Sequence, residues 1–391
     1  MSNGQQHTVP AVVLGLGLSA LGTVRSLGRA GVRPYLVCPK GDLAGYSRWS
    51  RRVLHVPETD DPAALGGALE RSGLAPAVLI PCTDEWSEVV ASLCAAGGSP
   101  FSTSAPDPAV VELLVDKERF AETVERHGVP HPRTLAVGDE ADLEGLDLDG
   151  FFLKPRRSQL FARRYHRKAF SFEGLEEARA AYRLIAGAGL GAVLQEYIPG
   201  PPTAHYFVDG FVDRTGAVAG LFPRRRLRMF PLDFGNSTLL LSVPLAEVEP
   251  AVASLRSLLA GIGYRGVFSA EFKRDPRDGL FKLLEINTRP WWFIEFATRC
   301  GVNVALLAYR DALGLELPDA GAFRVGERCV LLPQDVRAFR ALRRAGGPTL
   351  GAWVASWLGA TPTIFARDDP RPALSLPLVA ARRAVRRARG S

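Results

Sequence analysis

Two glutamates separated by a predicted turn form the part of this sequence best suited to chemistry. Glu271 and Glu285 each lie in a short apolar run, and the segment between them contains Pro276 and an Asp-Gly pair. Such residues are typical of the turn of a β-hairpin. Folding the two strands about that turn places Glu271 opposite Glu285, and side-chain alternation puts Asn287 on the same face as Glu285.

Glu271, Glu285 and Asn287 are suitable ligands for a hard cation. Two like charges across a strand pair repel each other unless something compensates them. Mg²⁺ takes carboxylate and amide oxygens, usually with few protein ligands and with phosphate oxygens completing its shell. The alternative is a surface hairpin whose acids pair with Lys273 and Arg289.

The lysines are few and could be selected for function. Only six of the 48 basic residues are lysine. A compact ammonium on a flexible stem suits the space beneath a triphosphate better than a planar guanidinium does. Lys117 opens a probable helix, and Lys154 ends an apolar strand, although solvated surface positions would also accommodate both residues.

The order of these pieces along the chain resembles the ATP-grasp superfamily, over roughly residues 10–315. The pieces are Lys117, residues 131–134, Lys154, residues 194–200, Glu271, and Glu285 with Asn287. The resemblance is closest to the carboxylate-amine ligase branch, which includes D-aspartate ligase-like enzymes and is related to the large subunit of carbamoyl phosphate synthetase. It implies an ATP- and magnesium-dependent enzyme that forms an amide or peptide bond through an acyl phosphate and releases ADP and phosphate. Amino acids or short peptides are the implied substrates.

The resemblance also implies roles for individual residues. Lys117 and Lys154 correspond to the lysines that bind the nucleotide phosphates, and Arg289 to the arginine that holds the transferring phosphate, so that Lys154 and Arg289 are the catalytic candidates. Glu271, Glu285 and Asn287 correspond to the ligands of Mg²⁺, for which Mn²⁺ could substitute. The linker that pairs with adenine, chiefly through its backbone, corresponds to Gln195, Glu196, Tyr197 and Ile198.

The chain departs from the family pattern at two places. A glycine-rich loop is expected after Lys154, but residues 156–168 contain no glycine. We expect Lys168, with Arg163 or Arg164, to cover the phosphates instead; a solvated basic connector is the alternative. An acidic ribose contact is expected after residue 202, where His205 stands, so the ribose contact is left unassigned.

Other residues are candidates for contacts with the substrate. Strand alternation would place Arg224, Arg226 and Arg228 on one face, where they would suit an anionic substrate or the γ-phosphate. A solvated edge strand is the alternative for this run. Trp291 could form an aromatic wall for the acceptor, or belong to the core.

The N-terminal segment must position part of the substrate side. A strand at 11–14 runs into Gly-x-Gly-x-x-Ala, the fingerprint of a dinucleotide-binding turn. The next strand is followed by Pro39 and Lys40 instead of the acid that would bind a ribose hydroxyl, so NAD binding is disfavoured. A third strand leads to Thr83 and Asp84, which are weak substrate-side candidates.

We therefore expect an α/β chain, with α+β character in its catalytic part: a Rossmann-like N-terminal domain followed by an ATP-grasp fold with a small lid. The expected divisions are residues 1–112 (Rossmann-like, substrate side), 113–200 (lid and adenine linker), 201–318 (catalytic, with the metal site) and 319–391 (a basic helical extension). A chain of 391 residues can bury a core of this size.

The composition limits the compartment in which the protein functions and the partners that it binds. Five scattered cysteines without Cys-x-x-Cys spacing indicate reduced thiols, and the N-terminus does not resemble a signal peptide, so we expect a cytoplasmic protein. The net charge of +7 arises from residues 324–391, which contain 13 arginines and four acids. Arginine is common throughout the chain, so these clusters do not indicate nucleic-acid binding.

The basic C-terminal part allows more than one interpretation. Residues 335–344 predict an amphipathic helix, and the uncharged stretch that follows is interrupted by glycines and Pro362, which argues against a membrane span. A helix packed on the catalytic body and an interfacial or partner-docking helix both stay open. The oligomeric state is open as well, a homodimer included. Two further functions are alternatives: an ATP-grasp small-molecule kinase, and a non-catalytic nucleotide-binding protein anchored by its basic tail.

Overall fold

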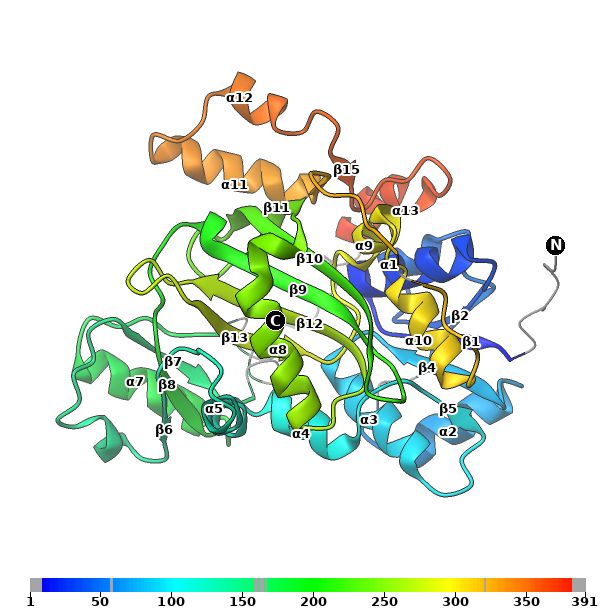
Figure 1. Cartoon of the computed structure of the whole chain (residues 1–391), viewed down its shortest axis with the longest axis horizontal. Coiled ribbons are helices and arrows are strands. Elements are labelled where there is room, and N and C mark those ends of the chain that lie inside the picture. Colours follow the sequence, from blue (N-terminus) through cyan, green and yellow to red (C-terminus); the bar gives the residue numbers. More distant parts are fainter. Residues whose placement is uncertain are drawn as a thin grey trace.

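The computed structural model describes residues 9–56, 59–157, 161, 165, 167–319 and 321–381. These residues form three sheets with helices packed around them, and the chain visits the sheets largely in order (Figure 1). This arrangement confirms the predicted mixed α/β fold.

The first sheet is parallel and has the strand order β3-β2-β1-β4-β5. Its strands are β1 (Ala11–Leu14), β2 (Tyr35–Val37), β3 (Arg52–Leu54), β4 (Ala77–Pro81) and β5 (Phe101–Ser102). The helices of this part are α1 (Gly17–Arg29), α2 (Pro62–Arg71), α3 (Asp84–Ala95) and α4 (Pro108–Val115). Every residue of β1 and β4 is buried, as expected for parallel strands covered on both faces.

The glycine-rich turn after β1 is shaped by close packing. Gly15 has a φ of +149°, and a Cβ built there would lie 2.8 Å from the Cβ of Cys82. No larger residue fits this approach without a shift of the backbone. Close packing against Cys82 therefore explains the first glycine of this turn.

A small antiparallel sheet of order β6-β8-β7 forms the lid subdomain. Its elements are β6 (Thr134–Val137), β7 (Phe151–Pro155), α7 (Leu175–Ala186) and β8 (Ala192–Glu196), whereas the preceding helix α5 (Lys117–Arg126) packs Phe120 and Val124 in the core of the large sheet. The lid has its own apolar core, which includes Leu153, Phe161 and Ile185. A separate core lets the lid hold its shape beside the larger sheet.

The largest sheet has the order β13-β12-β9-β10-β11-β14-β15. Its strands are β9 (His205–Val212), β10 (Val218–Phe230), β11 (Asn236–Ser242), β12 (Gly266–Arg274), β13 (Phe281–Asn287), β14 (Arg328–Val330) and β15 (Thr361–Pro362). The associated helices are α8 (Glu249–Gly261), α9 (Ile294–Cys300), α10 (Val304–Ala312), α11 (Leu332–Arg344), α12 (Leu350–Ala355) and α13 (Arg371–Leu374). Short 3₁₀ turns lie at Leu43–Tyr46, Glu140–Leu143, Pro202–Ala204 and Leu245–Val248.

The C-terminal segment differs from the expected helical extension. It contains the predicted amphipathic helix as α11, but it also adds β14 and β15 to the edge of the large sheet. β14 pairs with β11 because its buried Cys329 and Val330 extend the apolar surface of that sheet. Within the described part of the chain, no helix is long and apolar enough to cross a membrane.

The first sheet and the large sheet share one core. Apolar residues of β1, α1, α9 and α10 pack in a single cluster with residues of β9, β10 and β14. Phe296 and Tyr309 are fully buried there. This shared core fixes the N-terminal part against the large sheet, whereas the lid projects from the other end (Figure 1).

Candidate active site

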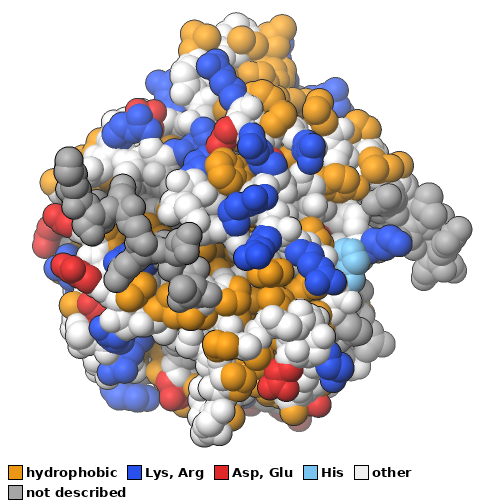
Figure 2. Space-filling view, turned by 90° about the vertical axis from the view of Figure 1, so that its right-hand side faces the viewer, with side chains coloured by type: hydrophobic (Ala, Val, Ile, Leu, Met, Phe, Trp, Pro, Cys, Tyr) orange, Lys and Arg blue, Asp and Glu red, His pale blue; other side chains and the backbone are white. Residues whose placement is uncertain are grey.

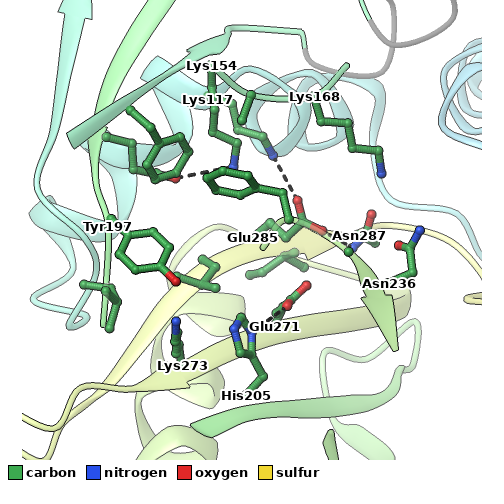
Figure 3. A pocket seen from close by; sticks show the side chains of 18 of the residues that line it. Lys117, Lys154, Lys168, Tyr197, His205, Asn236, Glu271, Lys273, Glu285 and Asn287 are labelled. Carbon is green, nitrogen blue, oxygen red and sulfur yellow. Dashed lines mark hydrogen bonds and ion pairs between the residues drawn. The ribbon is translucent and has the colours of Figure 1, made fainter. Parts of the chain in front are cut away.

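A cleft of about 1310 Å³, partly open to solvent, lies between the lid and the large sheet. Residues of β7, β8, β9, β10, β12 and β13 line it, together with the segment that joins β10 to β11. Figure 3 shows lysines on the lid side facing glutamates on the strands of the large sheet. The predicted site residues in the lining are Asp84, Lys117, Lys154, Lys168, Gln195, Glu196, Tyr197, Ile198, Arg226, Glu271, Glu285 and Asn287.

The predicted hairpin is confirmed. β12 and β13 are antiparallel neighbours, and Glu271 pairs directly with Glu285. Immediately afterwards the register shifts, because Phe272 pairs with Leu283 and leaves Leu284 as an extra residue. A β-bulge of this kind re-aims the neighbouring side chains, and Glu271, Glu285 and Asn287 all reach the cleft.

Glu271 is held by two basic side chains. Its Oε1 accepts a hydrogen bond of 2.9 Å from the Arg226 guanidinium and lies 3.0 Å from Nδ1 of His205. Burial alone would raise the pKa of Glu271, but Arg226 and His205 outweigh it and hold that pKa well below its usual range. Glu271 is therefore ionised at neutral pH.

Glu285 interacts with groups on both sides of the cleft. Its Oε2 lies 3.5 Å from Nζ of Lys117, and its Oε1 accepts a hydrogen bond of 3.0 Å from Nδ2 of Asn287. Burial and the facing Glu271 raise the pKa of Glu285, whereas Lys117 and Lys154 lower it, with a net lowering. Two ionised carboxylates thus face each other across the hairpin.

The two phosphate lysines predicted from the sequence approach the cleft from different elements. Lys117 is the first residue of α5, which Asp116 caps through the backbone N–H groups of residues 118 and 119. Lys154 lies near the end of β7 and donates to Oε1 of Gln195 at 3.3 Å. Burial, followed by the neighbouring Lys117, lowers the pKa of Lys154 to about 8.

The predicted adenine linker ends β8 at the mouth of the cleft. The backbone N–H of Glu196 donates to the carbonyl of Arg133, but the Arg133 N–H donates to the Glu196 carboxylate at 3.0 Å. The carboxylate thereby takes a place that the Glu196 carbonyl would hold in a regular ladder. Tyr197 then forms an aromatic group with Phe152 and Phe234, at centroid distances of 6.5 and 6.2 Å.

Arg289 connects the hairpin to the N-terminal part. Its guanidinium donates to both oxygens of Asp84, at 2.6 and 3.3 Å, and to Oδ1 of Asn287 at 3.4 Å. Burial would lower the pKa of Arg289, but Asp84 raises it overall. The structure therefore brings Arg289 and Asp84 into contact across 205 residues of sequence.

Several predicted substrate residues lie outside the cleft lining. Thr83 caps α3 by accepting from the Trp86 N–H, and Trp291 is buried in the core shared by the two larger sheets. Arg228 donates to both oxygens of Asp335, away from the cleft.

The predicted arginine face on β10 is therefore wrong as a unit. Arg224 pairs with buried Asp209, Arg226 pairs with Glu271, and a register shift separates Arg226 from Arg228. The solvated edge strand is wrong as well, because β10 lies between β9 and β11.

Lys273 is a pocket residue that the sequence interpretation missed. It is only 4% exposed, lines the cleft, and its Nζ lies 4.7 Å from the centre of the Tyr197 ring. Burial, followed by Arg226, lowers the pKa of Lys273 to about 8. The sequence could have indicated this, because Lys273 follows Glu271 by two residues and therefore lies on the same face of the strand.

Phe234 and Asn236, in the segment after β10, also line the cleft and were not predicted. Lys168 lines it as well, whereas Arg163 and Arg164, expected to assist Lys168, lie outside the described residues. Among the residues that the structure describes, no group of three His, Cys, Asp or Glu side chains could hold a metal ion. The candidate metal ligands are thus two carboxylates and one amide.

The arrangement is that of an ATP-grasp fold. A parallel N-terminal sheet is followed by a three-stranded lid and a large, mostly antiparallel sheet, and the last two meet at the cleft lined by lysines and glutamates. Solved structures with this fold include biotin carboxylase from Campylobacter jejuni (TM-score 0.64, 18% identity, covering 82% of this chain and 74% of that one). L-amino acid ligase from Bacillus licheniformis has a TM-score of 0.63 at 14% identity, covering 83% of this chain and 79% of that one. N5-carboxyaminoimidazole synthetase from Staphylococcus aureus, in complex with ADP, has a TM-score of 0.64 at 14% identity, covering 84% and 82%.

Among curated proteins, D-aspartate ligase from Enterococcus faecium (strain Aus0004) is 28% identical over 245 residues, which are 60% of this chain. The matched part is 58% of that ligase's length. No protein-family model matches the chain. The chain therefore has an ATP-grasp fold, and over the matched part it is similar in sequence to a ligase.

Proposed function

We propose that the protein is an ATP- and Mg²⁺-dependent ligase that joins a carboxylate to an amine through an acyl phosphate and releases ADP and phosphate. The observation that carries this proposal is the cleft in which Lys117 and Lys154 face the Glu271–Glu285 pair. Phosphoryl transfer to a carboxylate demands positioning and charge stabilisation, with little covalent chemistry from the protein. A cleft with cations on one wall and hard oxygen ligands on the other supplies both.

The nucleotide would lie with its phosphates near Lys117, Lys154 and Lys168. Its adenine would lie beside residues 195–198, where the Glu196 carboxylate already satisfies the Arg133 N–H and so releases the Glu196 carbonyl for another donor. The ring of Tyr197 and its aromatic neighbours would supply an apolar surface for the base.

His205 offers a ribose contact in place of the missing acid. Burial and Arg226 lower the pKa of His205, so its imidazole is neutral at pH 7. Because the Glu271 carboxylate can only accept, Nδ1 of His205 carries the proton of their 3.0 Å hydrogen bond. Nε2 is then an acceptor in the cleft, which is the property that a ribose hydroxyl requires.

The chemistry of the donor set fits Mg²⁺, with Mn²⁺ as a substitute. Glu271, Glu285 and Asn287 would hold the ion, and all three present oxygen atoms on adjacent strands. When bound, such an ion neutralises phosphate charge. Arg226 and Lys117 compensate the charges of the two carboxylates, and His205 donates a hydrogen bond to Glu271.

The substrate side lies toward the N-terminal part, where Arg289 meets Asp84. A guanidinium at this point can hold an acyl phosphate bidentately, and Asp84 fixes its orientation. Amino acids or short peptides are the proposed substrates, supported by the similarity to D-aspartate ligase and L-amino acid ligase. The five free cysteines, four of them buried, suit the cytoplasmic location that we propose.

The test is to incubate the protein with Mg-ATP and pools of amino acids, and to measure phosphate release and product mass. A condensed product of two substrates supports the ligase. A product that gains one phosphate would replace the proposal with a kinase. No release in any pool, with nucleotide binding retained, would indicate a non-catalytic nucleotide-binding protein.

A further inference from the structure

An uncharged apolar stripe follows one side of α12 and the turn after it. Leu350, Val354 and Leu358 are spaced four residues apart and are 59%, 45% and 74% exposed. No charged residue occurs between residues 345 and 366. Three large apolar side chains on one short protruding segment form the kind of surface that marks an interaction site.

Two tryptophans beside this stripe anchor α12 to the protein. The indole N–H groups of Trp353 and Trp357 donate to Oδ2 of Asp335 at 2.9 and 2.8 Å, and Trp353 stacks on Phe339 of α11. Asp335 is fully buried and also binds Arg228. These contacts fix the direction in which α12 faces, so the stripe cannot turn inward to join the core.

The neighbouring surface is basic. Arg337, Arg340 and Arg344 are exposed on α11 at helical spacing, and no Asp or Glu occurs between residues 336 and 366. α11 and α12 lie at the upper end of the molecule, far from the lid (Figure 1). Figure 2 shows largely hydrophobic side chains at that end, with Lys and Arg side chains below them.

We propose that this α11–α12 surface, consisting of Leu350, Val354, Leu358, Arg337, Arg340 and Arg344, docks the protein on an anionic lipid bilayer. Arginines attract anionic headgroups, and leucines on a protruding turn can enter the boundary between headgroups and acyl chains. A second copy of the chain is a poorer occupant, since the two arginine faces would repel each other. This docking is independent of the proposed ligase reaction.

The test uses the full chain in co-sedimentation with vesicles of phosphatidylcholine, with and without phosphatidylglycerol. We expect binding to the anionic vesicles only, and weakening with added salt. Leu350→Asp with Leu358→Asp should reduce binding by at least about tenfold, which corresponds to about 1.4 kcal/mol, because two apolar side chains can no longer enter the bilayer boundary. Leu184→Asp is the control: Leu184 is also an exposed leucine, on the lid helix α7, and this variant should bind normally.

A chain ending at residue 381 separates the surface from the arginines beyond it. It should keep leucine-dependent binding. The proposal is overturned if the full chain does not bind anionic vesicles at low salt, if the leucine variant binds as well as the wild type, or if the truncated chain loses all binding. A change of oligomeric state in the leucine variant, without a change in vesicle binding, would assign the stripe to a second copy. Circular dichroism of each variant verifies the fold.

Discussion

Replacing Glu285 by glutamine tests the candidate metal site most directly. The substitution keeps the shape of the side chain and its contact with Asn287, but it removes one of the two charges that face each other across the hairpin. If Glu285 supplies a charge that the transferring phosphoryl group needs, its loss should resemble the loss of other preorganised electrostatic groups. We expect phosphate release to fall by about 100- to 1000-fold.

The effect on stability should be small, because two electrostatic changes oppose each other. Lys117 loses its partner at 3.5 Å, but the repulsion of Glu285 by Glu271 disappears as well. The Glu285 side chain is 31% exposed, so solvent screens the pair. We expect a net loss of about 1 kcal/mol or less in the free energy of unfolding.

The assay measures phosphate release with Mg-ATP and a substrate pool that supports the wild type, together with thermal unfolding. Glu247→Gln is the matched control, since Glu247 forms a similar ion pair, with Arg225 at 3.7 Å, but lies outside the cleft lining. Turnover of Glu285→Gln equal to that of the control would refute the metal assignment. A collapse of the fold in Glu285→Gln would refute the charge balance.

Three further predictions concern other buried charges. The pKa of Lys154 is about 8, so its side chain loses its charge as the pH rises through that value. The KM for ATP should therefore increase above about pH 8, by up to about tenfold per pH unit. A KM that stays constant to about pH 9.5 would contradict this. Lys273→Met should leave kcat unchanged and raise the KM for ATP by roughly tenfold, because a charged hydrogen-bond donor is lost. The melting temperature should not fall, since Lys273 has no carboxylate partner among the described residues. An unchanged KM would exclude a contact between Lys273 and the nucleotide. Asp369→Asn should cost about 3 kcal/mol in chemical unfolding, because Asp369 and fully buried Arg25 form an ion pair of 2.9 Å; a loss below about 1 kcal/mol would contradict this.

The parts of the site that could be predicted are those that local rules determine. The hairpin followed from an Asp-Gly turn and from side-chain alternation, and its register placed Glu271 against Glu285 as expected. Lys117 and Lys154, which line the cleft, were singled out by their order along the chain relative to the other pieces of the resemblance. The hairpin itself depends on residues close together in the sequence.

The parts that could not be predicted depend on partners that are distant in the sequence. The arginines of β10 were expected to share one face, but Arg228 forms an ion pair with Asp335, 107 residues away in the sequence. Arg289 was expected to face a phosphate, and its bond to Asp84 depends on how the N-terminal sheet packs against the large one. Likewise, pairing with β11 decides whether the C-terminal segment forms strands.

The charges of the cleft explain why a polyanion would be drawn to its lid side. Asp84 and Glu196 line the cleft but are already bound by Arg289 and Arg277. Near the lid, Glu285 and Glu271 are the acids that act on Lys154, and Lys117 and Lys168 both contribute to its lowered pKa. Burial is the largest cause of that lowered pKa, and the neighbouring lysines add to it. Phosphate groups placed there would raise the pKa of Lys154 again, and the free energy of that shift would strengthen their binding. The same lysine that loses its charge at high pH in the empty site should therefore favour a nucleotide triphosphate.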